Sequence, residues 1–124
     1  MPLLSKHDAA KRQLNAAIRL FFAAGNPVDV HCLASSAANL YSDLVEKTTV
    51  KDSWRKRFAS TGDYRGNEVT QVLNHAWNFF KHGDWDADEE LDFEETQTEL
   101  LIFYAILECG ELESTSDEMQ VFQL

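Results

Sequence analysis

Eight consecutive apolar residues, Leu100 to Leu107, limit the folds that this chain can adopt. A helix built from this run is apolar on every side, so it must be covered on every side. The other helices of a bundle can pack on this helix, and so can the surface of a second subunit. In a chain of only 124 residues we expect both, so the run predicts a homodimer as well as a helical core.

The rest of the sequence predicts the other helices of the bundle. Residues 5–24, 26–47 and 67–82 each place apolar side chains about every 3.6 residues, as an amphipathic helix does. The apolar run belongs to a fourth helix, expected at 92–109, and residues 49–58 predict a short basic helix. We expect the four longer helices to supply the core and the short one to be peripheral.

Capping residues set the expected boundaries. Asn26 and Pro27 can begin the second helix directly after Gly25, so the first two helices should form an antiparallel hairpin. Residues 60–66 are rich in turn-forming residues and predict a loop. A capping box from Thr115 predicts a short last helix.

Length and composition fit one globular domain. The chain has five glycines and two prolines among 124 residues, and 44% of it is hydrophobic, which favours helices over a turn-rich β fold. The sequence therefore predicts an all-α protein, an antiparallel bundle of four to six helices in a single domain spanning residues 1–124.

Charge and cysteine content exclude some classes of function. The net charge of −10 argues against a general nucleic-acid coat, which needs a clustered positive field. Six basic residues do fall between Lys47 and Arg65, and they indicate either a solvated helix face or a local anion site. Cys32 and Cys109 lie far apart and predict reduced thiols. With no apolar signal core and no run long enough to cross a membrane, the chain is expected to be cytoplasmic.

A polar stripe on the helix at 67–82 holds the candidate site residues. His75, Asn78 and His82 point the same way because residues three, four and seven apart share a helix face. The stripe is either a solvated surface with two ordinary histidines or part of a functional site. We expect His31, at the border of the second helix's apolar face, to lie close to His82.

Carboxylates after Gly83 add a metal-binding hypothesis. His31, His75 and His82 with Asp84 or Asp86 would suit a divalent transition metal, because imidazole and carboxylate are ligands for such ions. The alternative is that the carboxylates accept hydrogen bonds from the imidazoles. The sequence requires no cofactor, and a divalent metal ion is the one that these residues could hold.

The segment from Asp84 to Glu95 also fits part of a calcium loop. Glu89 occupies the position where such a loop needs glycine, and no second loop is present to pair with it. Asp92 is expected instead to cap the following helix, with Glu95 closing a capping box. We therefore expect no tight calcium binding.

Two segments carry a resemblance to known proteins. LNAAIRLFF at 14–22 with PVDVHCLA at 27–34, and NFFKHGDWD at 78–86, resemble a family of small, uncharacterised bacterial helical proteins, for which no activity is assigned. A more distant resemblance is to the HEPN (higher eukaryotes and prokaryotes nucleotide-binding) bundles. That resemblance implies a dimer and RNA cleavage by an arginine and a histidine on one helix. Here Asn78 stands in the arginine's place before His82, which removes the cation expected to stabilise the phosphate.

These observations favour a non-catalytic, dimeric binding module over an enzyme, because no nucleophile motif, phosphate-binding glycine loop or HExxH motif is present. The expected partner is a second copy of the chain or another protein, and no membrane is involved. One alternative is an HEPN-like protein that binds or cleaves RNA with Asn78 and His82. The other is a divalent-metal protein that uses His31, His82 and the acidic loop.

Overall fold

The computed structural model describes residues 3–60, 64–83 and 87–124, except for the side chains of residues 58–60, 64–70, 72 and 73. Within these residues the regular secondary structure consists of helices and includes no strand, so the predicted all-α class is confirmed. The helices are α1 (Lys6–Phe22), α2 (Pro27–Thr48), α3 (Trp54–Ser60), α4 (Tyr64–Lys81), α5 (Glu95–Gly110) and α6 (Asp117–Phe122).

The first two helices form the expected hairpin. Ser5 caps α1 by accepting the Asp8 N–H at 3.0 Å, and Asn26 caps α2 by accepting the Val28 N–H at 2.9 Å. The turn between them is tight, because the Gly25 N–H donates to the carbonyl of Leu20 at 2.8 Å. A Cβ on Gly25 would lie only 3.1 Å from that carbonyl oxygen, so any side chain here would require its neighbours to shift by a few tenths of an ångström.

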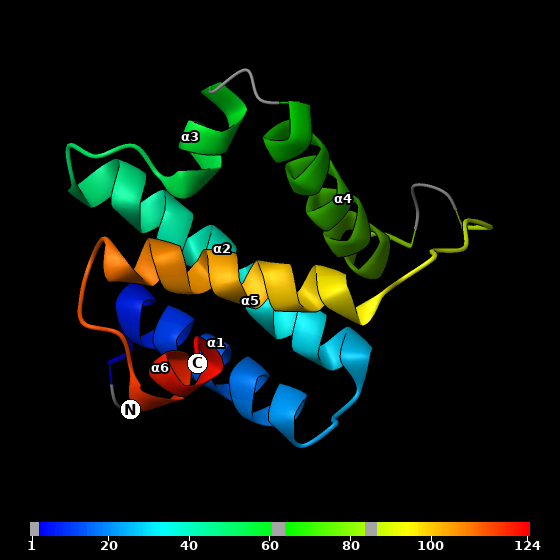
Figure 1. Ribbon diagram of the computed structural model, residues 1–124, viewed down its shortest axis with the longest axis horizontal. Helices are drawn as coiled ribbons and strands as arrows, with labels where there is room; N and C mark the ends of the chain where they lie inside the picture. The colour runs from blue at the N-terminus through cyan, green and yellow to red at the C-terminus, as the bar shows by residue number, and fades with distance from the viewer. Residues whose placement is uncertain (1–2, 61–63, 84–86) are drawn as a thin grey trace.

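The core lies between α1, α2 and α5, with α2 packed against both of the others (Figure 1). The sequence led us to expect the α5 segment at the centre, but α2 takes that place. A short helix, α6, closes the core from the α1 side with Met119. The buried cluster consists of Ala10, Leu14, Ala17, Ile18, Val30, Ala34, Ala37, Ala38, Tyr41, Leu101, Ile102, Ala105, Ile106, Cys109 and Met119.

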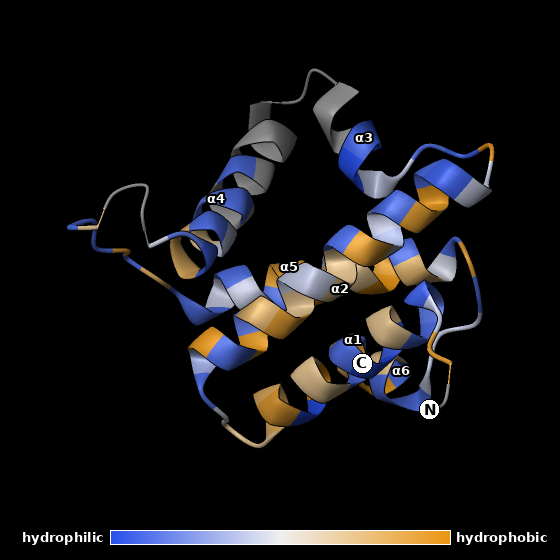
Figure 2. Cartoon of the chain, turned by 180° about the vertical axis from the view of Figure 1, so that it is seen from behind, coloured by the Kyte–Doolittle hydropathy of each residue, from blue (hydrophilic) through white to orange (hydrophobic). Residues whose placement is uncertain are grey.

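Helices α3 and α4 stand beside this three-helix body (Figure 1). The described residues of α3 are hydrophilic (Figure 2), in line with its predicted peripheral place. We expected the α4 segment to supply part of the core, together with the three other long helices. Among the described residues, Ala76 is the buried apolar residue of α4, and it lies outside the main cluster.

Two helix starts differ from the sequence prediction. The basic helix begins at Trp54, not at residue 49, because Ser53 caps it by accepting the Lys56 N–H at 3.1 Å. Thr49 ends α2 in an extended conformation and so cannot begin a helix. The following helix α4 already includes residues 64–66, which were expected in a loop.

Two caps near the C-terminus also differ. Helix α5 begins at Glu95, so Asp92 is not its N-cap; Glu94 occupies that position without a side-chain capping bond. Ser116 rather than Thr115 caps α6, accepting the Met119 N–H at 3.2 Å. The order of helices is the predicted one, because the middle of each helix follows the apolar periodicity. The prediction and the structure differ only in the end residues.

The apolar run in α5 is covered on one side only. Leu101, Ile102, Ala105 and Ile106 are buried, whereas Leu100 is 51% and Phe103 46% exposed. None of the helices in the described part of the chain has both the length and the apolar character needed to span a membrane.

Candidate functional site

Three of the predicted site residues line one pocket near the end of α4. His75, Asn78 and His82 face a hollow of about 250 Å³. The helix places them there because they are three, four and seven residues apart, so the prediction that they share a face is confirmed. The rest of the wall is formed by Phe79, Gly83, Ala87 and Glu89.

A short polar contact in this pocket joins His75 to Glu89. The His75 Nε2 atom lies 2.6 Å from Glu89 Oε1, with the histidine side chain 57% and the glutamate 30% exposed. In the sequence Glu89 was notable only as an obstacle to calcium binding, so its place in this site was not predicted. No local pattern links Glu89 to His75, since the contact depends on how the chain folds back after α4.

The end of α4 places His82 in the same pocket. The His82 N–H donates to the Asn78 carbonyl at 2.9 Å, which continues the helical hydrogen bonding by one residue. Lys81 turns away, with its Nζ atom 5.4 Å from the centre of the Trp77 ring. The two candidate catalytic residues, Asn78 and His82, therefore face one hollow, and the neighbouring cation does not.

His31 lies in a different setting. It is fully buried, its Nδ1 is 3.0 Å from Thr98 Oγ1, and its ring packs edge-to-face on Phe80 and Phe93 at 5.6 and 5.1 Å between centroids. Phe80 and Phe93 also pack on each other at 5.2 Å. This aromatic group ties the end of α4 to α2 and α5. The close approach of His31 to His82 stays a prediction, and His31 does not line the pocket that contains His82.

The remaining predicted metal ligands, Asp84 and Asp86, lie outside the described residues, as does the start of the proposed calcium loop. Among the residues that are described, no three metal-binding side chains are already gathered round one point. The metal hypothesis and the prediction of no tight calcium binding therefore both stay predictions.

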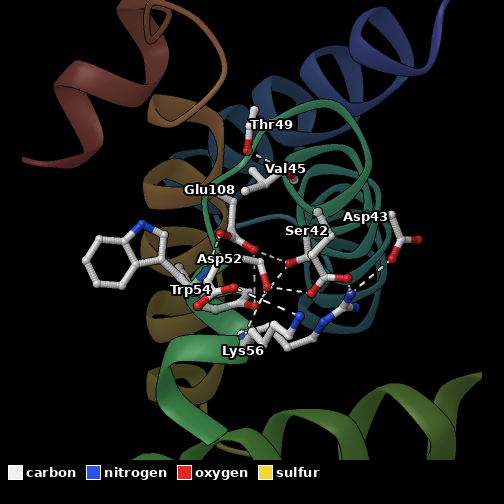
Figure 3. A network of polar contacts seen from close by, with 12 residues as sticks. Ser42, Asp43, Val45, Thr49, Asp52, Trp54, Lys56 and Glu108 are labelled. Atoms are coloured by element: carbon white, nitrogen blue, oxygen red, sulfur yellow. Dashed lines mark hydrogen bonds and ion pairs between the residues drawn. The ribbon is translucent and has the colours of Figure 1, made fainter. Parts of the chain in front are cut away.

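A second polar centre, not predicted from the sequence, surrounds Glu108 (Figure 3). This carboxylate is fully buried. Its Oε1 accepts the Trp54 backbone N–H at 2.6 Å, and its Oε2 accepts the hydroxyl groups of Ser42 and, at 3.4 Å, Tyr104. Burial raises the pKa of the Tyr104 hydroxyl, which keeps it protonated and able to donate.

Glu108 therefore holds three elements together. Ser42 belongs to α2, and Trp54 is the first residue of α3, where backbone N–H groups lack helical partners. A buried carboxylate needs such donors, because an unpaired one is expensive to remove from water. The sequence did carry a signal: Glu108 follows Leu101 and Ala105 on the buried face of α5, where an acidic residue calls for a partner.

Ion pairs surround this centre and use the basic segment. Arg55 bonds to Asp43 at 3.0 Å and to Glu46 at 3.1 Å. Glu46 also accepts the Ser53 hydroxyl at 2.7 Å, and this bond, with the charge of Arg55, lowers the pKa of Glu46.

Glu111 pairs in the same way with Lys51 at 3.0 Å and Arg57 at 3.5 Å, and the bond from Lys51 is the main cause of its lowered pKa. Lys56 lies 3.9 Å from Asp52. Four of the six clustered basic residues thus face carboxylates, so the described part of this segment attaches α3 to the body.

Comparison of the chain with protein-family models, with curated proteins and with solved structures found no match. The geometry of the residues therefore carries the functional argument.

Proposed function

We propose that this protein is a homodimeric binding module that acts by association and not by catalysis. One observation carries the proposal: the outer side of α5 is apolar and uncovered, with Leu100 and Phe103 about half exposed on a chain of net charge −10. Large exposed apolar patches on soluble proteins mark interaction sites.

The exposed side of α5 borders an aromatic groove. Phe21 packs edge-to-face on Phe22 and on Phe122, and the rings of Phe22 and Phe122 are tilted to each other, with all three centroid distances between 5.7 and 6.1 Å. Together with α5 they enclose a hollow of about 460 Å³. We call this surface the α5 face; it consists of Phe21, Phe22, Thr96, Glu99, Leu100, Phe103 and Phe122.

A second copy of the chain is the occupant that this face fits best. A two-fold contact needs a self-complementary surface, and the α5 face has a hollow beside projecting side chains, since Phe22 is 58% exposed. Glu99 is the charged residue of this face, and Arg19 lies outside the face on α1, one turn before Phe22, paired with Glu118 at 3.2 Å. Pairing two faces can bring Arg19 of one copy to Glu99 of the partner subunit.

The net charge predicts how the association depends on salt concentration. Each copy carries −10, so long-range repulsion opposes the dimer while apolar contact favours it. Salt screens the repulsion over about 10 Å at 0.1 M and leaves the apolar contact intact. We therefore expect the dimer to become tighter as salt is added, which is the reverse of an association driven by opposite charges.

Sedimentation velocity on two matched variants tests the proposal. Phe103→Glu places a charge in the middle of the α5 face and should weaken self-association at least tenfold. Val50→Glu adds the same charge at a fully exposed residue away from that face and should behave as the wild type. Equal dissociation constants for the two variants would place the contact elsewhere and refute the proposed face.

A cytoplasmic location is part of the proposal. It is supported by the two cysteines, which are both free thiols, with Cys109 buried and Cys32 half-buried. Reduced thiols are usual in the cytosol.

A second candidate function rests on a separate observation: Asn78 and His82 face the same pocket. In this alternative the protein binds or cleaves RNA, with His82 as the acid or base and Asn78 contacting the phosphate. Hydrolysis of mixed RNA by the wild type, lost in His82→Ala and kept in His7→Ala, would establish it. Absence of hydrolysis above the buffer rate would remove it.

A further inference from the structure

We propose that His75, Glu89 and His82 form a binding site for a divalent transition-metal ion such as zinc. The inference concerns the pocket at the end of α4 and does not depend on the dimer. It differs from the ligand set expected from the sequence, because Glu89 replaces the aspartates after Gly83 and His31 is absent from it.

Two of the three ligands already face each other at close range. His75 Nε2 and Glu89 Oε1 are 2.6 Å apart. An ion bound to both at the usual zinc distances of about 2.0–2.1 Å, with a tetrahedral angle between them, holds two such atoms about 3.3 Å apart. Inserting the ion therefore requires an opening of less than about 1 Å, at two side chains that are both partly exposed.

The third ligand comes from the same face of α4. His82 lies seven residues, or two turns, after His75 and lines the same hollow. The three side chains are not yet gathered round one point, so His82 must rotate about its side-chain bonds to complete the site. The hollow of about 250 Å³ leaves room for that movement and for a water as fourth ligand.

The local charge favours a cation in this pocket. The C-terminal end of a helix carries partial negative charge on its last carbonyl groups, and the pocket lies at that end of α4. Asp88 and Glu90 flank Glu89 and are exposed. The nearest lysine in the sequence, Lys81, is stacked towards Trp77, which is on the opposite side of the helix from His75 and His82.

The type of ligand selects the type of ion. Two imidazole nitrogens and one carboxylate oxygen suit zinc, nickel, copper or cobalt, whereas calcium and magnesium prefer sites made of oxygen atoms. The site shares Glu89 with the calcium loop considered for residues 84–95 but differs from it in its two imidazole ligands, so calcium should not compete for it.

Titration calorimetry of the full chain with zinc chloride, after dialysis against a chelator, tests this inference. We expect one zinc per chain, at least tenfold weaker binding in each of His75→Ala, His82→Ala and Glu89→Gln, and no effect of excess calcium. His7→Ala is the matched histidine control, and Cys32→Ser controls for zinc held by a thiolate; both should bind as the wild type does. Circular dichroism of each variant checks that it is folded.

Three results would overturn the inference: no zinc binding by the wild type, binding that persists in His75→Ala, or binding that is unchanged in His82→Ala. Cobalt supplies a second readout, because a tetrahedral cobalt site absorbs visible light strongly. A weak absorption typical of six-coordinate cobalt would contradict the three-ligand geometry even if metal is bound.

Discussion

Replacing Glu108 with alanine should destabilise the protein by about 2–6 kcal/mol. The substitution removes the acceptor for the Ser42 hydroxyl and for the Trp54 backbone N–H, and an unsatisfied buried donor costs about 1–3 kcal/mol. The Ser42 hydroxyl keeps the Tyr104 hydroxyl, 3.1 Å away, as a partner, and water can reach the Trp54 N–H once the carboxylate is gone. We therefore expect a value below the upper limit, about 3–4 kcal/mol. That is a large share of the roughly 5–15 kcal/mol that stabilises a typical domain.

Urea unfolding measures this effect, with all variants at one protein concentration so that self-association contributes equally. Glu108→Gln keeps the shape and one acceptor oxygen, and we expect it to lose about half as much stability as Glu108→Ala. The control is Glu113→Gln, an exposed carboxylate beyond the end of α5, which should stay within about 0.5 kcal/mol of the wild type. If Glu108→Ala unfolds at the same urea concentration as the control, Glu108 is not the residue that holds α2, α3 and α5 together.

Three further predictions concern acid, the buried histidine and the thiols. The pKa values of Glu46 and Glu111 are lowered below 4.5 in the folded protein. Their ion pairs therefore stabilise the protein at neutral pH, and this stabilisation is lost as the pH falls from about 5 through the lowered pKa values. Thermal melts between pH 7 and 3 should show the loss of stability, and the loss should be smaller in Lys51→Gln. His31→Ala opens a cavity between Phe80 and Phe93 and should lower the free energy of unfolding by about 2–4 kcal/mol, whereas a change no larger than that of His7→Ala would show that this aromatic group does not hold α4. Burial raises the pKa of Cys32 and of Cys109, so a thiol reagent at pH 7 should modify both slowly, Cys32 first; rapid modification of Cys109 in the folded protein would contradict its burial.

The positions of helices were predicted well from the sequence for those helices that pack along their whole length. The Asn26–Pro27 start was predicted to the residue, because capping and apolar spacing are local properties. The starts at Trp54 and Glu95 were missed, because apolar spacing does not mark Ser53 as the residue that accepts the Lys56 N–H, and Glu94 precedes α5 without a side-chain capping bond. Of the core predicted for α4, Ala76 is buried, and the side chains of residues 64–70, 72 and 73 lie outside the described part of the chain.

The candidate site could be predicted in part, for the same reason. The shared face of His75, Asn78 and His82 follows from helical spacing alone. The contribution of Glu89 depends on the path of the chain after α4, which no periodicity describes. Glu108 escaped notice because it closes an apolar run, although its place on the buried face of α5 indicated a buried partner.

The mass of the wild-type protein in solution tests the central claim most directly. Light scattering on protein eluting from a sizing column, at physiological salt and tens of micromolar chain, should give twice the chain mass of 14.1 kDa. The mass should return to one chain in Phe103→Glu and remain at two in Val50→Glu. A wild-type mass of 14.1 kDa at every concentration and salt would contradict the account, because Leu100 and Phe103 would then face water in the working protein.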